Sequence, residues 1–112
     1  MNILCYGDSN TYGYDPRPDS GGRYPADCRW VDILAAGTGW KIQNVGRNGR
    51  TIPCGPIVIP EGIDLTIVML GTNDLLQGNR ADVVAARMET FLSSTAPHPV
   101  FLIAPPPLQS GE

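Results

Sequence analysis

Met1-Asn-Ile-Leu-Cys-Tyr-Gly-Asp-Ser9 is the stretch from which the fold of this chain can be worked out. Its apolar run, Ile3 to Tyr6, predicts a short buried strand that breaks at Gly7. An acid and a hydroxyl, Asp8 and Ser9, follow directly. A rigid strand end can present a reactive group on the loop after it, which makes Ser9 a candidate nucleophile. Asp and Ser are also common helix caps, so the tripeptide by itself fits a structural cap equally well.

The composition is that of an ordinary globular protein, and 112 residues suffice for one domain at most. Apolar residues make up 42% and charged residues 17% of the chain, whose net charge is −3. This charge and the scattered Lys and Arg residues argue against a nucleic-acid partner. No apolar run approaches the ~20 residues of a membrane span, and Met1 leads into a strand without the pattern of a signal peptide. We therefore expect a cytoplasmic protein with no nucleic-acid or membrane partner.

Three cysteines, Cys5, Cys28 and Cys54, are present without a CxxC spacing. Cys5 falls in the first predicted strand, where it is expected to be a small buried hydrophobe. Three separated cysteines and one histidine offer a poor ligand set for zinc. We expect no metal and no other cofactor.

A loop, a helix and a second strand are predicted next. Turn-forming residues dominate positions 10–22 and predict a loop. Apolar residues then keep helical spacing, which predicts a helix over Asp27–Ala36 with Trp30, Ile33 and Leu34 on one face and Val31 beside them. The alternating pattern over Trp40–Val45 predicts a second strand. A strand–helix–strand unit makes parallel pairing through a right-handed crossover the default.

The most apolar run of the chain is Asp64–Leu70. It predicts a central parallel strand covered on both faces, and it delivers the polar segment Gly71-Thr-Asn-Asp74. A second helix is predicted over Ala81–Leu92, and a fourth strand over Val100–Ala104, halted by Pro105-Pro-Pro107. The pattern indicates an α/β protein with a parallel sheet, whose polar loops follow three strands at one edge. In open α/β sheets, this carboxyl edge is where ligands bind.

These loops carry the groups needed for acyl transfer. The Ser9 hydroxyl can attack a carbonyl, and backbone N–H groups at Gly46 or Gly49 and the Asn73 amide can stabilise the oxyanion. Removing one such donor from a serine protease costs about 10²–10³ in rate. A nucleophilic serine also needs a base. The one histidine, His98, precedes the fourth predicted strand and is expected at the opposite end of the sheet from Ser9.

The three polar segments resemble those of a known family, the SGNH (or GDSL-type) hydrolases. Gly7-Asp8-Ser9 resembles the first block of the family, Asn44-Val-Gly-Arg-Asn-Gly-Arg-Thr51 the second, and Gly71-Thr-Asn-Asp74 the third. Each block follows directly after a predicted parallel strand, in the order of the family. With Arg29-Trp30 and Pro105-Pro-Pro-Leu108, the wider context is similar to the arylesterase and acyltransferase branch. The resemblance runs the whole chain.

The resemblance implies a three-layer flavodoxin-like α/β fold and a serine esterase that acts on small acyl esters. By position, Ser9 would be the nucleophile and would add its own N–H to the oxyanion hole. Gly49 would give a second backbone N–H, and Asn73 the side-chain donor. Gly46 is the alternative to Gly49, because the second block can be aligned either way.

Two features depart from the usual pattern of the family. Asn10 stands where many members carry Leu, a position without a catalytic role. More importantly, the family's DxxH motif supplies the acid and the base, and no Asp-x-x-His occurs here. We therefore expect residues 1–112 to be the N-terminal portion of a single SGNH domain, without its last strand and helix. The base and acid are then expected beyond Glu112, and this chain alone is expected to be inactive.

Further expectations concern structural residues, partners and the alternative function. Asp8 and Asp74 are expected to hold loops in place. The unpaired side of the fourth strand favours a homo-oligomer. The alternative function is a non-catalytic flavodoxin-like module that binds an anion with its glycine-rich loops. Neither GxGxxG nor GxxxxGK[ST] occurs, however, and no loop has the basic character of a phosphate site.

Overall fold

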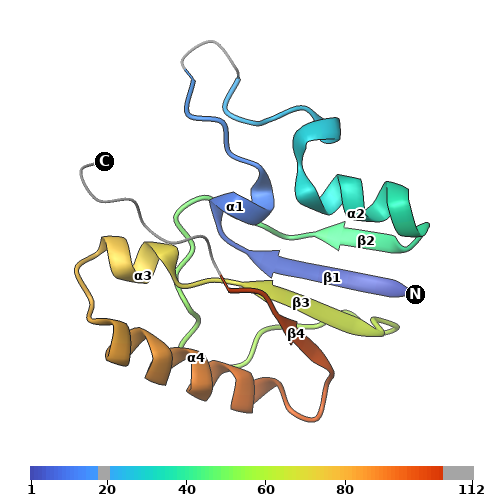
Figure 1. Ribbon diagram of the computed structural model, residues 1–112. Helices are drawn as coiled ribbons and strands as arrows, with labels where there is room; N and C mark the ends of the chain where they lie inside the picture. The colour runs from blue at the N-terminus through green and yellow to red at the C-terminus, as the bar shows by residue number, and fades with distance from the viewer. Residues whose placement is uncertain (18–20, 105–112) are drawn as a thin grey trace.

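A four-stranded parallel sheet forms the centre of the computed structural model, which describes residues 1–17 and 21–104 (Figure 1). The strand order is β2-β1-β3-β4, and all three neighbouring pairs are parallel. The strands are β1 (Asn2–Gly7), β2 (Lys41–Asn44), β3 (Leu65–Met69) and β4 (Val100–Leu102). The predicted parallel α/β sheet is therefore confirmed, with a strand order of the flavodoxin-like type. Pro105–Pro107, predicted to end the fourth strand, lies outside the described residues.

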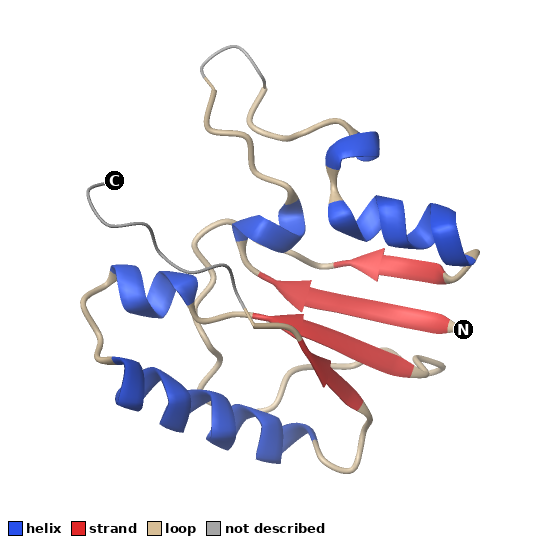
Figure 2. Ribbon diagram, viewed as in Figure 1, coloured by secondary structure: helices blue, strands red, loops and turns tan. Residues whose placement is uncertain are grey.

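Helices cover both faces of the sheet, which gives three layers (Figure 2). The longest, α4, lies on one face and α2 on the other. The helical elements are α1 (Ser9–Tyr12), the 3-10 turn η1 (Ala26–Cys28), α2 (Trp30–Thr38), α3 (Thr72–Leu76) and α4 (Ala81–Thr95). None of these helices, within the part of the chain described, is long and apolar enough to cross a bilayer.

The core is divided by the sheet into two apolar clusters. On the α4 face, Val68 and Leu70 of the third-strand segment pack with Phe91. On the α2 face, Cys5 and Ile67 belong to the second cluster. Neighbouring side chains of β3 thus point to opposite faces and are buried on each, as predicted for a central strand. Burial raises the pKa of the Cys5 thiol to about 11, which fits its predicted place in the core.

The helix predicted over Asp27–Ala36 is wrong at its start and at one residue of its apolar face. Residues 26–28 form the separate 3-10 turn, and α2 begins only at Trp30, after an N-cap at Arg29 without a capping side chain. Val31 is buried in the core with 2% of its surface exposed, whereas Ile33, which was expected on the apolar face, is 53% exposed. Trp30 and Leu34 pack against the core as expected.

The loop predicted over residues 10–22 is also partly wrong. The short helix α1 occupies its beginning, because Asp8 caps it and Gly13 ends it with a left-handed conformation at φ 88°. The five-residue helix α3 was likewise not predicted. Both helices are too short for periodicity to reveal them, and both lie where a strand delivers its polar segment.

The edge strand β4 leaves part of the α2 face open. Its hydrogen-bonded neighbour within the described residues is β3 alone. Phe101 of β4 is 59% exposed, and it lines an apolar groove of about 450 Å³ beside α2. Its lining also includes Leu65 and Ile67 of β3 and Trp30 of α2.

Candidate active site

The three polar segments singled out in the sequence meet at one edge of the sheet. The register pairs Cys5 with Asn44 and Gly7 with Met69, so that β1, β2 and β3 end together. Figure 1 shows α1, the loop after β2 and α3 around the arrowheads of these strands. The predicted common edge is confirmed.

Ser9 is the first residue of α1, directly after the strand that positions it. The cap of this helix is Asp8, whose Oδ1 accepts a hydrogen bond from the Asn10 N–H at 3.0 Å. The Ser9 side chain is half-buried, and its hydroxyl forms no hydrogen bond within the described part of the chain. The two roles left open for this tripeptide are therefore compatible: the acid caps the helix, and the hydroxyl is free.

Helix α1 is held in place by side chains from three other segments. With four residues it is too short to be stable alone. Three successive carbonyls, those of Asn10, Thr11 and Tyr12, accept in turn from Trp30 Nε1 (3.1 Å), Asn44 Nδ2 (2.9 Å) and Arg23 Nε (2.8 Å). The role of the Trp30 indole was missed by sequence reasoning, which placed this residue only on an apolar helix face. The one available signal was chemical, because a buried indole N–H usually finds an acceptor.

Gly46 and Gly49 occupy different environments in the loop after β2. A Cβ on Gly46 would lie 2.4 Å from the Tyr12 nitrogen, so this glycine lets the loop pack against α1. Its N–H is engaged by Asn44 Oδ1 at 2.8 Å. Gly49 is exposed, has a left-handed φ of 78°, and its N–H forms no hydrogen bond within the described residues. Of the two candidates, Gly49 is therefore the one with an available donor.

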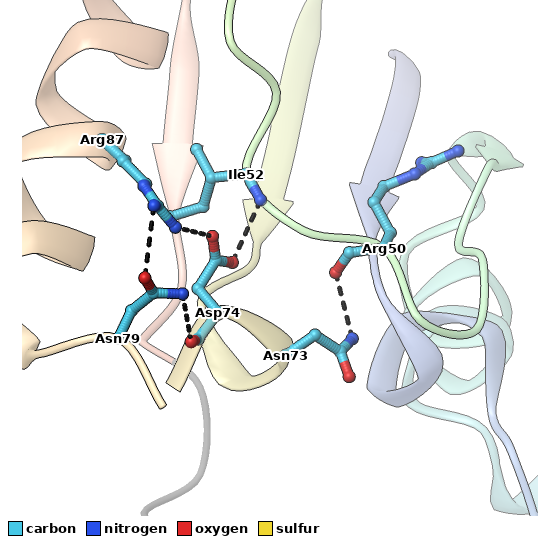
Figure 3. Close-up of polar contacts among 6 residues, drawn as sticks. All are labelled: Arg50, Ile52, Asn73, Asp74, Asn79 and Arg87. Atoms are coloured by element: carbon cyan, nitrogen blue, oxygen red, sulfur yellow. Dashed lines mark hydrogen bonds and ion pairs between the residues drawn. The ribbon is translucent and has the colours of Figure 1, made fainter. Parts of the chain in front are cut away.

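Asn73 is the second residue of α3 and is half-buried. Its Nδ2 donates to the backbone carbonyl of Arg50 at 3.0 Å (Figure 3). This bond uses one of the two amide hydrogens and leaves the other free for a ligand. Because Arg50 is the next residue after Gly49, the bond brings the Asn73 amide beside the Gly49 turn.

Asp74 joins the loop after β2 to α3 and α4, as Figure 3 shows. Its carboxylate is buried, accepts from the Ile52 N–H at 3.0 Å, and pairs with the Arg87 guanidinium at 3.3 Å. Its backbone carbonyl accepts from Asn79 Nδ2 at 2.9 Å. The predicted role of Asp74 in holding a loop is confirmed, and so is that of Asp8 as the cap of α1.

The carboxyl group of Asp8, the residue before Ser9, is fully buried. Burial raises its pKa above the ordinary value, and the nearby Asp74 carboxylate acts in the same direction, while the bonds to Asn10 oppose the shift. Its second oxygen, Oδ2, has no hydrogen-bond partner among the described residues. The charged form of Asp8 is thus destabilised by its surroundings.

His98 lies at the other end of the sheet, as predicted. Its Nε2 is 3.0 Å from Thr66 Oγ1 at the start of β3. Gly7, at the end of β1 near Ser9, pairs with Met69 of β3, three residues after Thr66. Three strand residues span roughly 10 Å, which separates His98 from the edge that carries Ser9. His98 therefore cannot reach Ser9 in this structure.

In residues 1–17 and 21–104, no three His, Cys, Asp or Glu side chains are grouped so that they could hold a metal ion.

Comparisons with known proteins place these features in a family. Residues 5–112 match the model of the GDSL-like Lipase/Acylhydrolase family. No curated protein matches the chain in sequence.

Several solved structures are similar to the chain. One is a carbohydrate acetylesterase family member from Sinorhizobium meliloti (25% identity, TM-score 0.75, 97% of this chain and 64% of that chain). Another is the M. smegmatis aryl esterase (30%, 0.71, 96% and 65%), and a third is the lipase/acylhydrolase from Enterococcus faecalis (26%, 0.70, 99% and 60%). The chain thus spans less than two thirds of the length of each. The family model matches residues 5–112, almost the whole sequence, and this match shows that the chain belongs to the GDSL-like lipase/acylhydrolase family.

Proposed function

We propose that this chain carries the nucleophile and the oxyanion-binding groups of a serine esterase that acts on small acyl esters. The observation that carries the proposal is the bond from Asn73 to the Arg50 carbonyl. It holds a side-chain amide beside the Gly49 N–H, at the sheet edge that carries the Ser9 hydroxyl, and neither of these two groups has a partner among residues 1–17 and 21–104. A nucleophile and several donors for one oxyanion are the equipment for acyl transfer.

In the proposed reaction, Ser9 Oγ attacks the carbonyl carbon of the ester. The carbonyl oxygen becomes an oxyanion, which accepts hydrogen bonds from the N–H groups of Ser9 and Gly49 and from Asn73 Nδ2. The proton taken from Ser9 is returned to the leaving oxygen, so that the group departs as the alcohol. Water then hydrolyses the acyl-serine, which releases the acid and restores the Ser9 hydroxyl. Each preorganised donor is expected to stabilise the transition state by about 2.7–4 kcal/mol.

The Ser9 proton needs a general base, which the described residues do not place at this edge. His98 is bound to Thr66 at the other end, and the Asp74 carboxylate is committed to Ile52 and Arg87. We propose that the base and its acid lie beyond Glu112, that residues 1–112 are the N-terminal portion of one SGNH domain, and that this chain alone is inactive. The greater length of the similar solved structures supports this view.

The names of the similar structures bear on the substrate class. They include a carbohydrate acetylesterase family member and an aryl esterase. We propose a short acyl group on an aryl or sugar alcohol as the substrate of this chain too. The anion-binding alternative has less support, because the Arg50 side chain donates inward to the Val45 carbonyl rather than outward to a ligand.

Replacing Ser9 with Ala tests the proposal. In the longest form of the protein that its gene encodes, Ser9→Ala is expected to reduce hydrolysis of phenyl acetate by at least about 10³-fold, because the nucleophile is lost. His98→Gln is the matched control, and is expected to leave the rate unchanged. A fluorophosphonate probe followed by mass spectrometry should label Ser9 in that form and far more slowly in residues 1–112. Unchanged hydrolysis by Ser9→Ala would refute the proposed function.

A further inference from the structure

Arg50 connects all three polar segments of the candidate active site. Its backbone carbonyl accepts the Asn73 amide at 3.0 Å. Its side chain turns back toward the strands, where Nη1 donates to the Val45 carbonyl at 2.6 Å and lies 3.5 Å from the Gly7 carbonyl. Gly7 is the last residue of β1, two positions before Ser9. One residue therefore touches the ends of β1 and β2 and the beginning of α3.

The guanidinium is also fixed from its flat side. It lies over the Tyr6 ring, with 4.1 Å from the Arg50 Cζ to the ring centroid. No carboxylate forms an ion pair with it among residues 1–17 and 21–104. A planar, delocalised cation suits both the ring face and the carbonyl acceptors, whereas a lysine ammonium lacks the fork and the plane.

The Gly49 turn needs such an anchor. A Cβ on Gly49 would meet nothing within 4 Å, so packing does not fix the position of the turn. Two backbone bonds help, from the Arg50 N–H to the Arg47 carbonyl at 3.2 Å and from the Arg47 N–H to the Gly7 carbonyl at 3.1 Å. The Arg50 side chain, which donates to the Val45 carbonyl at 2.6 Å, ties this turn to the strand ends, and Arg50 is the residue directly after the donor at Gly49.

We propose that Arg50 is a positioning residue that holds the Gly49 N–H and the Asn73 amide in register with Ser9. The proposal rests on the proposed function for its catalytic meaning, because a misplaced donor matters only if an oxyanion forms there. Arg50 acts through its neighbours and does not itself touch the reacting atoms. Its guanidinium locks the turn to β1, and its carbonyl orients the amide.

A first test reads the geometry without any need for activity. Amide spectra of ¹⁵N-labelled residues 1–112 are compared for wild type, Arg50→Ala, Arg50→Lys and the control Arg47→Ala. Arg47 lies exposed in the same loop, and its side chain forms no bond within the described residues. Arg47→Ala removes one positive charge, as Arg50→Ala does, but breaks no side-chain contact. We expect the Gly49 N–H and Asn73 Nδ2 signals to shift or broaden in both Arg50 variants and to stay in place in Arg47→Ala. Wild-type signals in both Arg50 variants would overturn the proposal.

A second test reads the consequence in the longest encoded form. Arg50→Ala and Arg50→Lys are expected to lower kcat about 10–100-fold, the scale on which misplacement of about 1 Å acts, with KM changed less than about twofold. Added methylguanidinium should restore part of kcat in Arg50→Ala and none in Arg50→Lys. Unchanged kcat in both variants would overturn the proposal. If the wild-type protein hydrolyses no ester, the proposed function is refuted, and the amide spectra still decide whether Arg50 fixes the two donors.

If Arg50→Ala does not fold, Arg50→Lys alone is compared with the wild type, both in the amide spectra and in kcat.

Discussion

Asp8 illustrates how one residue can stabilise a helix end and still be costly at neutral pH. Its Oδ1 caps α1, yet the carboxyl group is fully buried and its Oδ2 lacks a partner within the described residues. Burial disfavours the charged form, which is why the pKa of this group is raised. The favourable contribution of the protonated form is present below the ordinary pKa of 3.8, and it is lost as the pH rises through the higher pKa of the folded state.

Asp8→Asn should therefore change the pH dependence of stability. The variant keeps a cap acceptor but does not titrate, so the unfolding free energy of the wild type should fall relative to the variant as the pH rises from 4 toward 7. Urea unfolding followed by the fluorescence of Trp30 and Trp40 measures this difference at each pH. Asp82→Asn removes an exposed carboxylate from α4 and controls for net charge. A difference that stays constant over this pH range would contradict the prediction.

The place of a single residue in the fold could be predicted from the sequence where that residue closely follows a strand. Ser9 and Asn73 follow apolar runs that are easy to recognise, so their common edge could be inferred. Trp30 and Arg50 could not be assigned in this way, because their acceptors at Asn10 and Gly7 lie 20 and 43 positions away in the sequence. Such bonds depend on register and on side-chain direction, neither of which is visible in a local pattern.

Among the elements, α1 depends most on its surroundings. Four residues cannot form a stable helix alone, so neighbours must supply the stability that local propensity does not. Side-chain donors hold three of its carbonyls, and the loop at Gly46 closes against its backbone. This dependence is also why the element was predicted as a loop. The strand β3, by contrast, was predicted with nearly correct bounds because it is buried on both faces.

Gly46→Ala should disturb the packing of the loop after β2 against α1. The added Cβ would lie 2.4 Å from the Tyr12 nitrogen and 2.8 Å from the Thr11 carbonyl carbon, so backbone must move. We expect a loss of about 1–3 kcal/mol in unfolding free energy, the usual cost of overpacking, measured by urea unfolding. Gly55→Ala is the matched control, since a Cβ there meets nothing within 4 Å. Equal stability of the two variants would show that the loop and α1 are not closely packed.

For the whole molecule, the parallel sheet explains both the grouping of the candidate site residues and the exposure of strand β4. Parallel strands end together, which gathers Ser9, Gly49 and Asn73 at one edge. The same sheet leaves β4 at its border, with the apolar groove beside it. Parallel sheets are normally covered on both faces, and a bare apolar edge is prone to pair with other chains.

We propose that copies of residues 1–112 associate through β4, and Phe101→Lys tests this. The substitution places a charge on a 59% exposed edge residue, which should block both strand pairing and burial of the groove. Sedimentation velocity over a range of concentrations should show association of the wild type and a shift toward monomer in the variant. Val58→Lys is the matched control, because it adds the same charge at a 92% exposed residue in the loop between β2 and β3. If Val58→Lys reduces association as much as Phe101→Lys does, net charge rather than the sheet edge governs the contact.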